Sequence, residues 1–175
     1  MEVDFHGDDL FYYQSYTHSK LHPDFQKFCI DDEKMFPTYK ILEEKGIPVL
    51  FHTGDKRYDF SGPRRLMKVI ERFPDLVCIG AHFGGYSEWE HAREYPKHKN
   101  LYFDTSSSLW VMTNEEAREF IDMFGAEQFM FGSDFPMWTP KEELEKFLAI
   151  GLDDEVNKKI LNENFERLFK IENKM

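Results

Sequence analysis

Short apolar segments that each end in histidine or aspartate alternate with helix-forming stretches along most of the chain. This alternation is typical of βαβ units and a parallel sheet. In parallel α/β folds the carboxyl ends of the strands meet at one face, where catalytic side chains gather. We therefore predict an α/β fold with its functional site at that face. The predicted strands cover residues 47–52, 76–82, 101–104 and 129–134.

Helix start and stop signals fill the gaps between these strands. Thr113 and Thr139 each precede a glutamate by three residues, which is a capping box, and a Ser-Gly-Pro sequence opens another helix over 64–72. An earlier helix is expected over 33–45, closed by Gly46, with Pro37 delaying or kinking its start. The last predicted helix covers 161–170 and turns one apolar face toward the sheet. That face consists of Leu161, Phe165, Leu168 and Phe169.

Composition limits the size of the fold and the class of partner. With 175 residues, 41% of them hydrophobic, the chain can build one sizeable core, so we expect a single domain over residues 1–175. A formal net charge of −11 opposes phosphate backbones and anionic headgroups, and we expect neither nucleic acid nor a membrane as partner. The start of the chain has no secretory pattern, which predicts a cytoplasmic protein. The expected partner is a small-molecule substrate.

Three side chains at the predicted strand ends form a candidate metal site. His52 is followed by Gly54, which permits an abrupt turn, and His82 is followed by a pair of glycines. Asp134 lies between an apolar strand and Pro136. Two imidazoles and a carboxylate are a ligand set that Zn²⁺ prefers, with a position left for water. Each residue alone could be an ordinary polar group, but their convergence favours metal-assisted chemistry.

Four motifs follow one another along the chain: Lys20-Leu-His22-Pro23, His52-Thr-Gly54, Ala81-His82-Phe-Gly-Gly85 and Gly132-Ser-Asp134-Phe-Pro136. In this order and at these spacings they resemble strands four, five, six and eight of the amidohydrolase-related superfamily. That superfamily includes the aminocarboxymuconate-semialdehyde decarboxylase-like branch and implies a distorted (β/α)₈ barrel. Closing such a barrel takes about 250 residues, so we expect a partial TIM-type barrel with roughly strands 4–8.

The resemblance also implies roles for individual residues. His52 resembles the strand-five metal ligand of the superfamily. Asp134 resembles the strand-eight aspartate, which binds the metal and accepts the proton of the attacking water. His82 resembles the strand-six histidine that orients or protonates the reacting group, so we predict a catalytic role for it first and a metal-ligand role second.

Three further residues are candidates for contact with the substrate. Lys20 and His22 alternate onto the same side of a short strand, which in the superfamily faces the barrel interior. Substrate contact by His22 and simple packing in the core are both open. Asp104 follows the strand-seven pattern, where it could hold a neighbouring imidazole in place or cap the following turn.

The beginning of the chain departs from the superfamily pattern. Members start with a His-x-His pair on strand one, whereas this chain reads Val3-Asp4-Phe5-His6-Gly7-Asp8. In one interpretation the barrel is shortened internally, and His6 and Asp8 join His52 and Asp134 around the metal, since positions two apart share a strand face. In the other interpretation this beginning resembles strand one by chance. An open sheet also exposes unpaired edges, which predicts self-association.

These features support a metal-dependent hydrolase that uses a metal-activated water on a small carbonyl, amide or lactone substrate. A close variant is nonoxidative decarboxylation of a small unsaturated acid in the same site. The expected cofactor is a divalent metal, Zn²⁺ first and Mn²⁺ as the alternative. A different class of function is a catalytically silent barrel remnant that acts as a binding or assembly module, and metal binding distinguishes the two.

Overall fold

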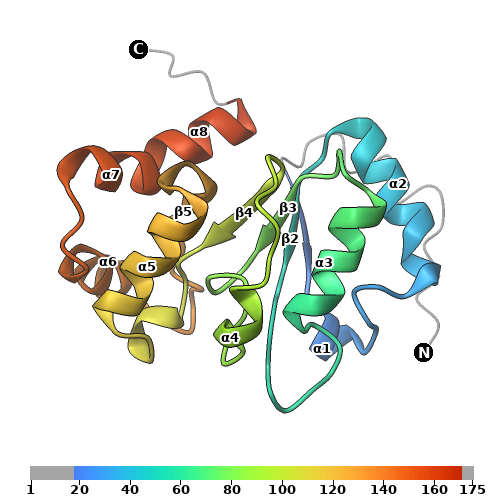
Figure 1. Ribbon diagram of the computed structural model, residues 1–175, viewed down its shortest axis with the longest axis horizontal. Coiled ribbons are helices and arrows are strands. Elements are labelled where there is room, and N and C mark those ends of the chain that lie inside the picture. The colour runs from blue at the N-terminus through green and yellow to red at the C-terminus, as the bar shows by residue number, and fades with distance from the viewer. Residues whose placement is uncertain (1–17, 171–175) are drawn as a thin grey trace.

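The computed structural model describes residues 18–170, and over these residues it holds one sheet of five parallel strands (Figure 1). Each strand pairs with the next one along the chain. A doubly wound sheet reverses its strand order at a switch point, whereas a β/α barrel keeps the order of the chain. The fold is therefore part of a TIM-type barrel, as predicted. The strands are β1 (Ser19–Leu21), β2 (Val49–Phe51), β3 (Cys78–Gly80), β4 (Leu101–Asp104) and β5 (Phe129–Met130).

Helices connect the successive strands. Figure 1 shows α2 and α3 beside β2 and β3, and α5, α6, α7 and α8 gathered around β5 on the other side of the molecule. Short turns of 3₁₀ helix cover Glu33–Met35, Ser108–Trp110 and Ala126–Gln128. The α-helices are α1 (Pro23–Gln26), α2 (Phe36–Lys45), α3 (Pro63–Arg72), α4 (Trp89–Ala92), α5 (Asn114–Phe124), α6 (Pro140–Ala149), α7 (Asp154–Lys158) and α8 (Asn164–Phe169).

Three of the predicted strands are shorter in the structure than in the sequence pattern. At the start of β2, Pro48 has no N–H group to join a ladder. Beyond the carboxyl end of β3, His82 adopts a left-handed backbone conformation with φ of 61°. Asp134, beyond β5, does the same with φ of 55°. Extended pairing cannot continue through this conformation. The strand-end side chains therefore lie in the first turns of the loops that follow the strands.

The predicted helix signals are confirmed. Thr113 and Thr139 each form a complete capping box at the start of α5 and α6. The helix that was expected over 33–45 begins as a 3₁₀ turn and becomes α2 at Phe36, next to Pro37. It ends where Gly46 takes the left-handed C-cap conformation, with φ of 61°.

The predicted packing face of the last helix is wrong in part: Leu161 packs against the core as predicted, but Phe165 does not. The segment is helical from α7 to α8, but a π-helical turn over Lys159–Glu163 joins them and changes which side chains face the sheet. Ile160 and Asn164 are fully buried, whereas Phe165 is 42% exposed. The amide of Asn164 donates to the carbonyls of Ala126 and Phe129, at 2.7 and 2.8 Å. These bonds to the end of β5 hold a polar residue where the pattern predicted an apolar one.

The two faces of the sheet differ in what covers them. Residues at alternate strand positions pack against the helices in one hydrophobic cluster, and the intervening positions point to the other face. The register pairs Leu21 with Phe51, and both belong to the helix-side cluster. The next position along each strand, His22 and His52, therefore begins on the opposite face, which corresponds to the barrel interior. The strand residues of the cluster are Leu21, Val49, Phe51, Cys78, Leu101, Phe103 and Phe129.

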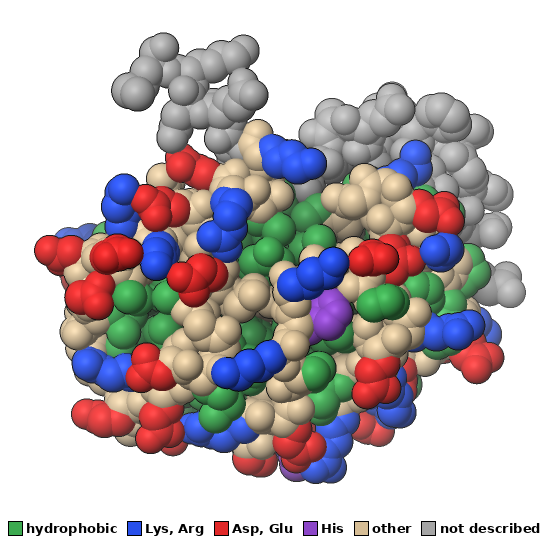
Figure 2. Space-filling view, turned by 45° about the horizontal axis from the view of Figure 1, so that its top comes forward, with side chains coloured by type: hydrophobic (Ala, Val, Ile, Leu, Met, Phe, Trp, Pro, Cys, Tyr) green, Lys and Arg blue, Asp and Glu red, His purple; other side chains and the backbone are tan. Residues whose placement is uncertain are grey.

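The surface carries charges of both signs. Figure 2 shows acidic and basic side chains interspersed over the face that it presents, with hydrophobic side chains reaching the surface between them. Ion pairs join separate elements, such as Arg64 with Glu94 at 2.7 Å and Arg93 with Glu119 at 3.1 Å. Within residues 18–170, no helix has the length and apolar character needed to cross a membrane.

Candidate metal and catalytic site

Two histidine rings stack where β1 and β2 end. His22 follows β1 and His52 follows β2, and their ring centroids are 4.0 Å apart with the planes inclined by 10°. The ring of Phe25 stacks on the other face of His22, at 3.9 Å and 15°. Because the two strands pair in parallel with this register, neighbouring strand ends bring the two imidazoles together. The sequence-predicted residues His22 and His52 therefore do share one site.

A chain of hydrogen bonds connects His52, His82 and the backbone of Ser106. The Nδ1 atom of His82 lies 2.9 Å from the carbonyl of Ser106, which can only accept, so this nitrogen donates. In the tautomer with Nδ1 as the one protonated nitrogen, Nε2 of His82 accepts, and the Nδ1–H of His52 donates to it at 3.0 Å. The remaining ring nitrogen of His52, Nε2, is left with a free lone pair.

His82 is buried, with 4% of its surface exposed, and both of its ring nitrogens are engaged. Its backbone N–H donates to Asp104 at 2.9 Å, and its carbonyl accepts from the Trp89 indole at 2.9 Å. In this arrangement His82 lies behind His52 and holds its ring in place. The predicted catalytic role of His82 stays a prediction, and the structure adds a positioning contact to His52.

Asp24 is a site residue that the sequence reasoning missed. It lies in the first turn of α1, next to Pro23, and only 6% of its surface is exposed. Its Oδ2 atom accepts from the Ser61 hydroxyl at 2.6 Å and lies 3.5 Å from Nε2 of His52. An aspartate after a His-Pro pair at a strand end was the available signal, because the short turn sends its side chain back toward the strand ends.

Three residues bring ligand atoms close enough to share one cation. His22, Asp24 and His52 each offer one such atom, and all three atoms lie within 4.8 Å of one another. The Nδ1 atom of His22 and the Oδ1 atom of Asp24 are buried without a hydrogen-bond partner. Buried polar atoms are nearly always satisfied in folded proteins. Two imidazoles and a carboxylate with unused valences are a donor set that fits a divalent metal.

The electrostatics of the group fit the same ligand set. Burial, together with the neighbouring imidazoles of His82 and His22, lowers the pKa of His52 to about 3. Burial also lowers the pKa of His22 and raises the pKa of Asp24. Both imidazoles are consequently neutral near pH 7, which is the form that binds metals. Among residues 18–170, no Lys or Arg forms an ion pair with the Asp24 carboxylate to offset its burial.

The structure places the other predicted site residues outside this group. Asp134 lies four residues beyond β5, and its Oδ2 atom accepts from the Ser107 hydroxyl at 2.9 Å. Asp104 uses its Oδ1 atom to accept from the backbone N–H of His82 and from the N–H and hydroxyl of Ser106, at 2.9, 3.0 and 2.6 Å. It thus organises the turn that supports His82. Lys20 is exposed on β1. His6 and Asp8 lie outside the described residues.

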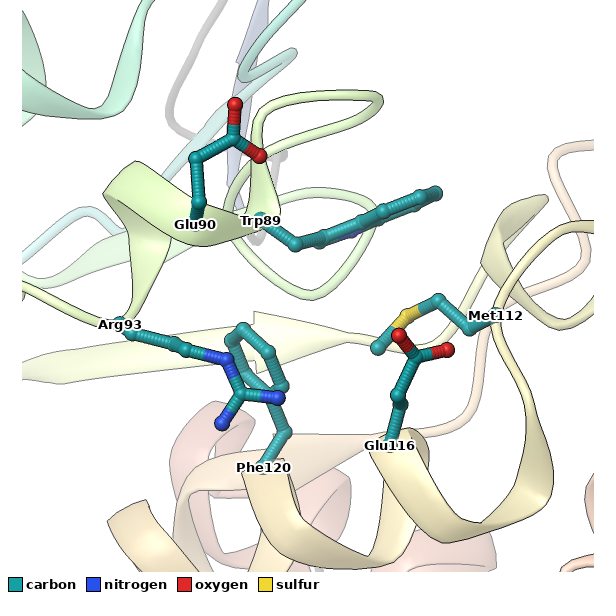
Figure 3. A pocket seen from close by; sticks show the side chains of 6 residues that line it. All are labelled: Trp89, Glu90, Arg93, Met112, Glu116 and Phe120. Atoms are coloured by element: carbon teal, nitrogen blue, oxygen red, sulfur yellow. The ribbon is translucent and has the colours of Figure 1, made fainter.

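A separate pocket of about 270 Å³ opens between α4 and α5. Figure 3 shows Trp89, Glu90 and Arg93 from the α4 segment opposite Glu116 and Phe120 of α5. The guanidinium of Arg93 lies 4.7 Å from the centroid of the Phe120 ring. None of the predicted site residues lines this pocket. Trp89 connects it to the site through the hydrogen bond from its indole to the backbone of His82.

Comparison with known proteins assigns the region that contains the candidate site to a family. A family model described as amidohydrolase matches residues 18–171. The chain belongs to this amidohydrolase family. The match covers all five strands and every residue of the candidate site from His22 to Asp134, so the resemblance that was read from four motifs is confirmed. No curated protein is a significant match to the chain.

Solved structures show the same fold in longer chains. An uncharacterised TIM-barrel protein from Bordetella bronchiseptica is 29% identical, with a TM-score of 0.69 over 82% of this chain and 52% of its own. A dihydroxybenzoic acid decarboxylase from a Polaromonas species, with bound manganese and the inhibitor 2-nitroresorcinol, is 19% identical, with a TM-score of 0.61 over 81% and 55%. A candidate 2-pyrone-4,6-dicarboxylic acid hydrolase from Pseudomonas putida is 16% identical, with a TM-score of 0.69 over 97% and 70%. This amidohydrolase chain spans about half the length of the first two.

Proposed function

We propose that this chain is the site-bearing part of a metal-dependent amidohydrolase that acts on a small molecule with a carbonyl or carboxylate group. The reaction is hydrolysis of a small carbonyl, amide or lactone substrate, or nonoxidative decarboxylation of a small unsaturated acid. The observation that carries the proposal is the meeting of His52, its partner His82 and the buried carboxylate of Asp24 beyond the carboxyl ends of the parallel strands. In β/α barrels this face holds the catalytic groups.

A bound divalent ion at this face would polarise the substrate oxygen and make a water molecule acidic near neutral pH. The residues of the chain supply the rest. His52 presents a neutral ring whose free nitrogen points toward Asp24, and His82 keeps that ring from turning by accepting the bond from its other nitrogen. Such support of a ligand imidazole from behind raises its basicity and fixes its orientation.

Two predicted residues would handle the substrate rather than the metal. Asp134 is half-buried and accepts a hydrogen bond from Ser107 through one oxygen. We assign it the predicted role of proton acceptor for hydrolysis. Lys20 is an exposed cation on the interior face of β1, where it would attract a substrate carboxylate through its charge.

The related structures support both reactions without choosing between them. One is a decarboxylase of dihydroxybenzoic acid that holds manganese, and another is named as a candidate hydrolase of a pyrone dicarboxylic acid. Their names share an acidic ring substrate, and we infer the same broad class for this chain. Zn²⁺ is the first candidate for the metal and Mn²⁺ the second. Self-association of the open barrel also stays a prediction.

The test loads the chain with Zn²⁺ or Mn²⁺ and supplies two panels of compounds. Lactones and amides are assayed for ring opening or acid release, and aromatic or unsaturated acids for release of carbon dioxide. We expect turnover in one panel, dependent on added metal and lost in His52→Gln. Stoichiometric metal without turnover in either panel would contradict the proposed substrate classes. A chain that binds neither metal would contradict the proposal and favour the alternative of a silent barrel remnant.

A further inference from the structure

The buried carboxylate of Asp24 lacks a positive partner. Its side chain is 2% exposed, and among the described residues its only ion-pair contact is with Nε2 of His52 at 3.5 Å. One oxygen accepts from Ser61, and the other has no hydrogen bond. Burial of an ionised carboxylate without a partner costs several kcal/mol. A cation bound beside Asp24 would therefore offset the cost of burying this carboxylate.

His52 does not supply the positive charge beside Asp24 in this arrangement. Its Nδ1–H is committed to His82, which leaves the lone pair of Nε2 facing the Asp24 oxygen. A shared proton would draw these two atoms to about 2.7–3.2 Å, and the observed separation is longer. Two ligand atoms on a tetrahedral zinc ion, each about 2.0–2.2 Å from the metal, lie roughly 3.3–3.6 Å apart. The observed 3.5 Å is closer to this second spacing.

His22 completes the group from the neighbouring strand. Its ring lies nearly parallel to that of His52, and its Nδ1 atom is buried without a partner. The exposed ring of Phe25 covers its outer face. We propose that His22, Asp24 and His52 bind one divalent metal ion, with Asp24 as its carboxylate ligand. This inference rests on the proposed function, because it names the residues that hold the metal of that function.

The assignment differs from the one that the resemblance implies for the carboxylate. Asp134 follows the end of β5, four strands away from His22 on β1 in the order of the sheet, and it hydrogen-bonds to Ser107. It is not among the residues whose ligand atoms lie within 4.8 Å of one another. Asp24 instead follows β1, directly beside the end of β2 that carries His52. The two assignments therefore differ in which Asp→Asn substitution should abolish metal binding, the one at Asp24 or the one at Asp134.

The experiment measures Zn²⁺ and Co²⁺ binding to the full chain by titration calorimetry and by metal content after dialysis. The variants are Asp24→Asn and His22→Gln, with Asp134→Asn as the control that makes the same chemical change at the other carboxylate. Loss of a residue behind a metal ligand weakens binding about 10–100-fold, so loss of a ligand should exceed that. We expect a loss of more than about 100-fold for Asp24→Asn and His22→Gln. The control should keep its affinity within about threefold.

The visible absorption of bound Co²⁺ gives a second readout, because its bands follow the ligand set and not the activity. They should change or vanish in both site variants and persist in Asp134→Asn. Unchanged binding in Asp24→Asn together with loss in Asp134→Asn would overturn the inference and leave the proposed function standing. Absence of metal from the wild-type chain would overturn both. Circular dichroism reports folding, and if Asp24→Asn does not fold, unchanged binding in the half-buried His22→Gln overturns the inference.

Discussion

The turn after His52 depends on Gly54, which makes Gly54→Ala the most informative single change in the loop framework. Gly54 has φ of 77°, and its N–H donates to the Ser61 carbonyl at 2.8 Å. A Cβ atom added there would lie 2.6 Å from the Gly85 carbonyl carbon and from the Tyr86 oxygen, and 2.7 Å from the Tyr86 nitrogen. All three neighbours are backbone atoms of the loop that follows His82, so they cannot rotate away as a side chain would.

The expected cost has two parts. An alanine in the left-handed region costs roughly 1–2 kcal/mol, and forcing extra volume into a packed site costs typically 1–3 kcal/mol more. The sum is about 2–5 kcal/mol, against a total stability of roughly 5–15 kcal/mol for a typical domain. Gly46→Ala isolates the first part, because Gly46 has φ of 61° but no atom within 4 Å of the added Cβ.

Urea unfolding followed by circular dichroism measures both variants against the wild type. With a slope of about 2 kcal/mol per molar urea, Gly54→Ala should unfold roughly 1–2.5 M earlier than the wild type, and Gly46→Ala roughly 0.5–1 M earlier. Equal losses in the two variants would refute the steric reasoning. They would mean that the loops after β2 and β3 separate freely and do not hold His52 against His82.

Two further predictions concern charge and support of the site. Burial raises the pKa of Asp31, but hydrogen bonds from Lys68 and Arg65 outweigh this effect and leave the pKa lowered. At pH values above the unfolded pKa of about 3.9, the wild type should therefore be more stable than Asp31→Asn by about 1 kcal/mol. Acid-unfolding curves should show that this difference disappears as the pH falls through the folded pKa. Ser61→Ala removes the hydrogen bond to Asp24 and should weaken Zn²⁺ binding about 10–100-fold without loss of fold, whereas unchanged affinity in calorimetry would argue against metal contact by that carboxylate.

The order of strands and helices was accessible from the sequence because its signals are local. A capping box such as that of Thr113 depends on residues only three apart in the sequence. The strand that ends at His52 can likewise be recognised from the hydrophobic pattern of its own few residues. His22 and His52 could be placed on one face for the same reason. The face of the last helix was missed because the bonds of Asn164 run to residues 35 and 38 positions away.

The composition of the site was less accessible, because it depends on burial and on contacts between loops. An acidic residue in the first turn of a helix, such as Asp24, is usually a surface residue that favours the helix N-terminus. Nothing in the sequence shows that Ser61 and His52 enclose it. His82 is the converse case, since its motif predicts a reactive side chain while the fold turns both ring nitrogens to protein partners.

One metal ion should be held by His22, Asp24 and His52, and anomalous X-ray diffraction tests this most directly. Crystals of the chain grown with Zn²⁺ would be measured on both sides of the zinc absorption edge. We expect one strong anomalous peak about 2.0–2.2 Å from a nitrogen of each histidine and from a carboxylate oxygen of Asp24. A peak on His52 and Asp134 with Asp24 at a distance, or no peak among these residues, would contradict this ligand assignment.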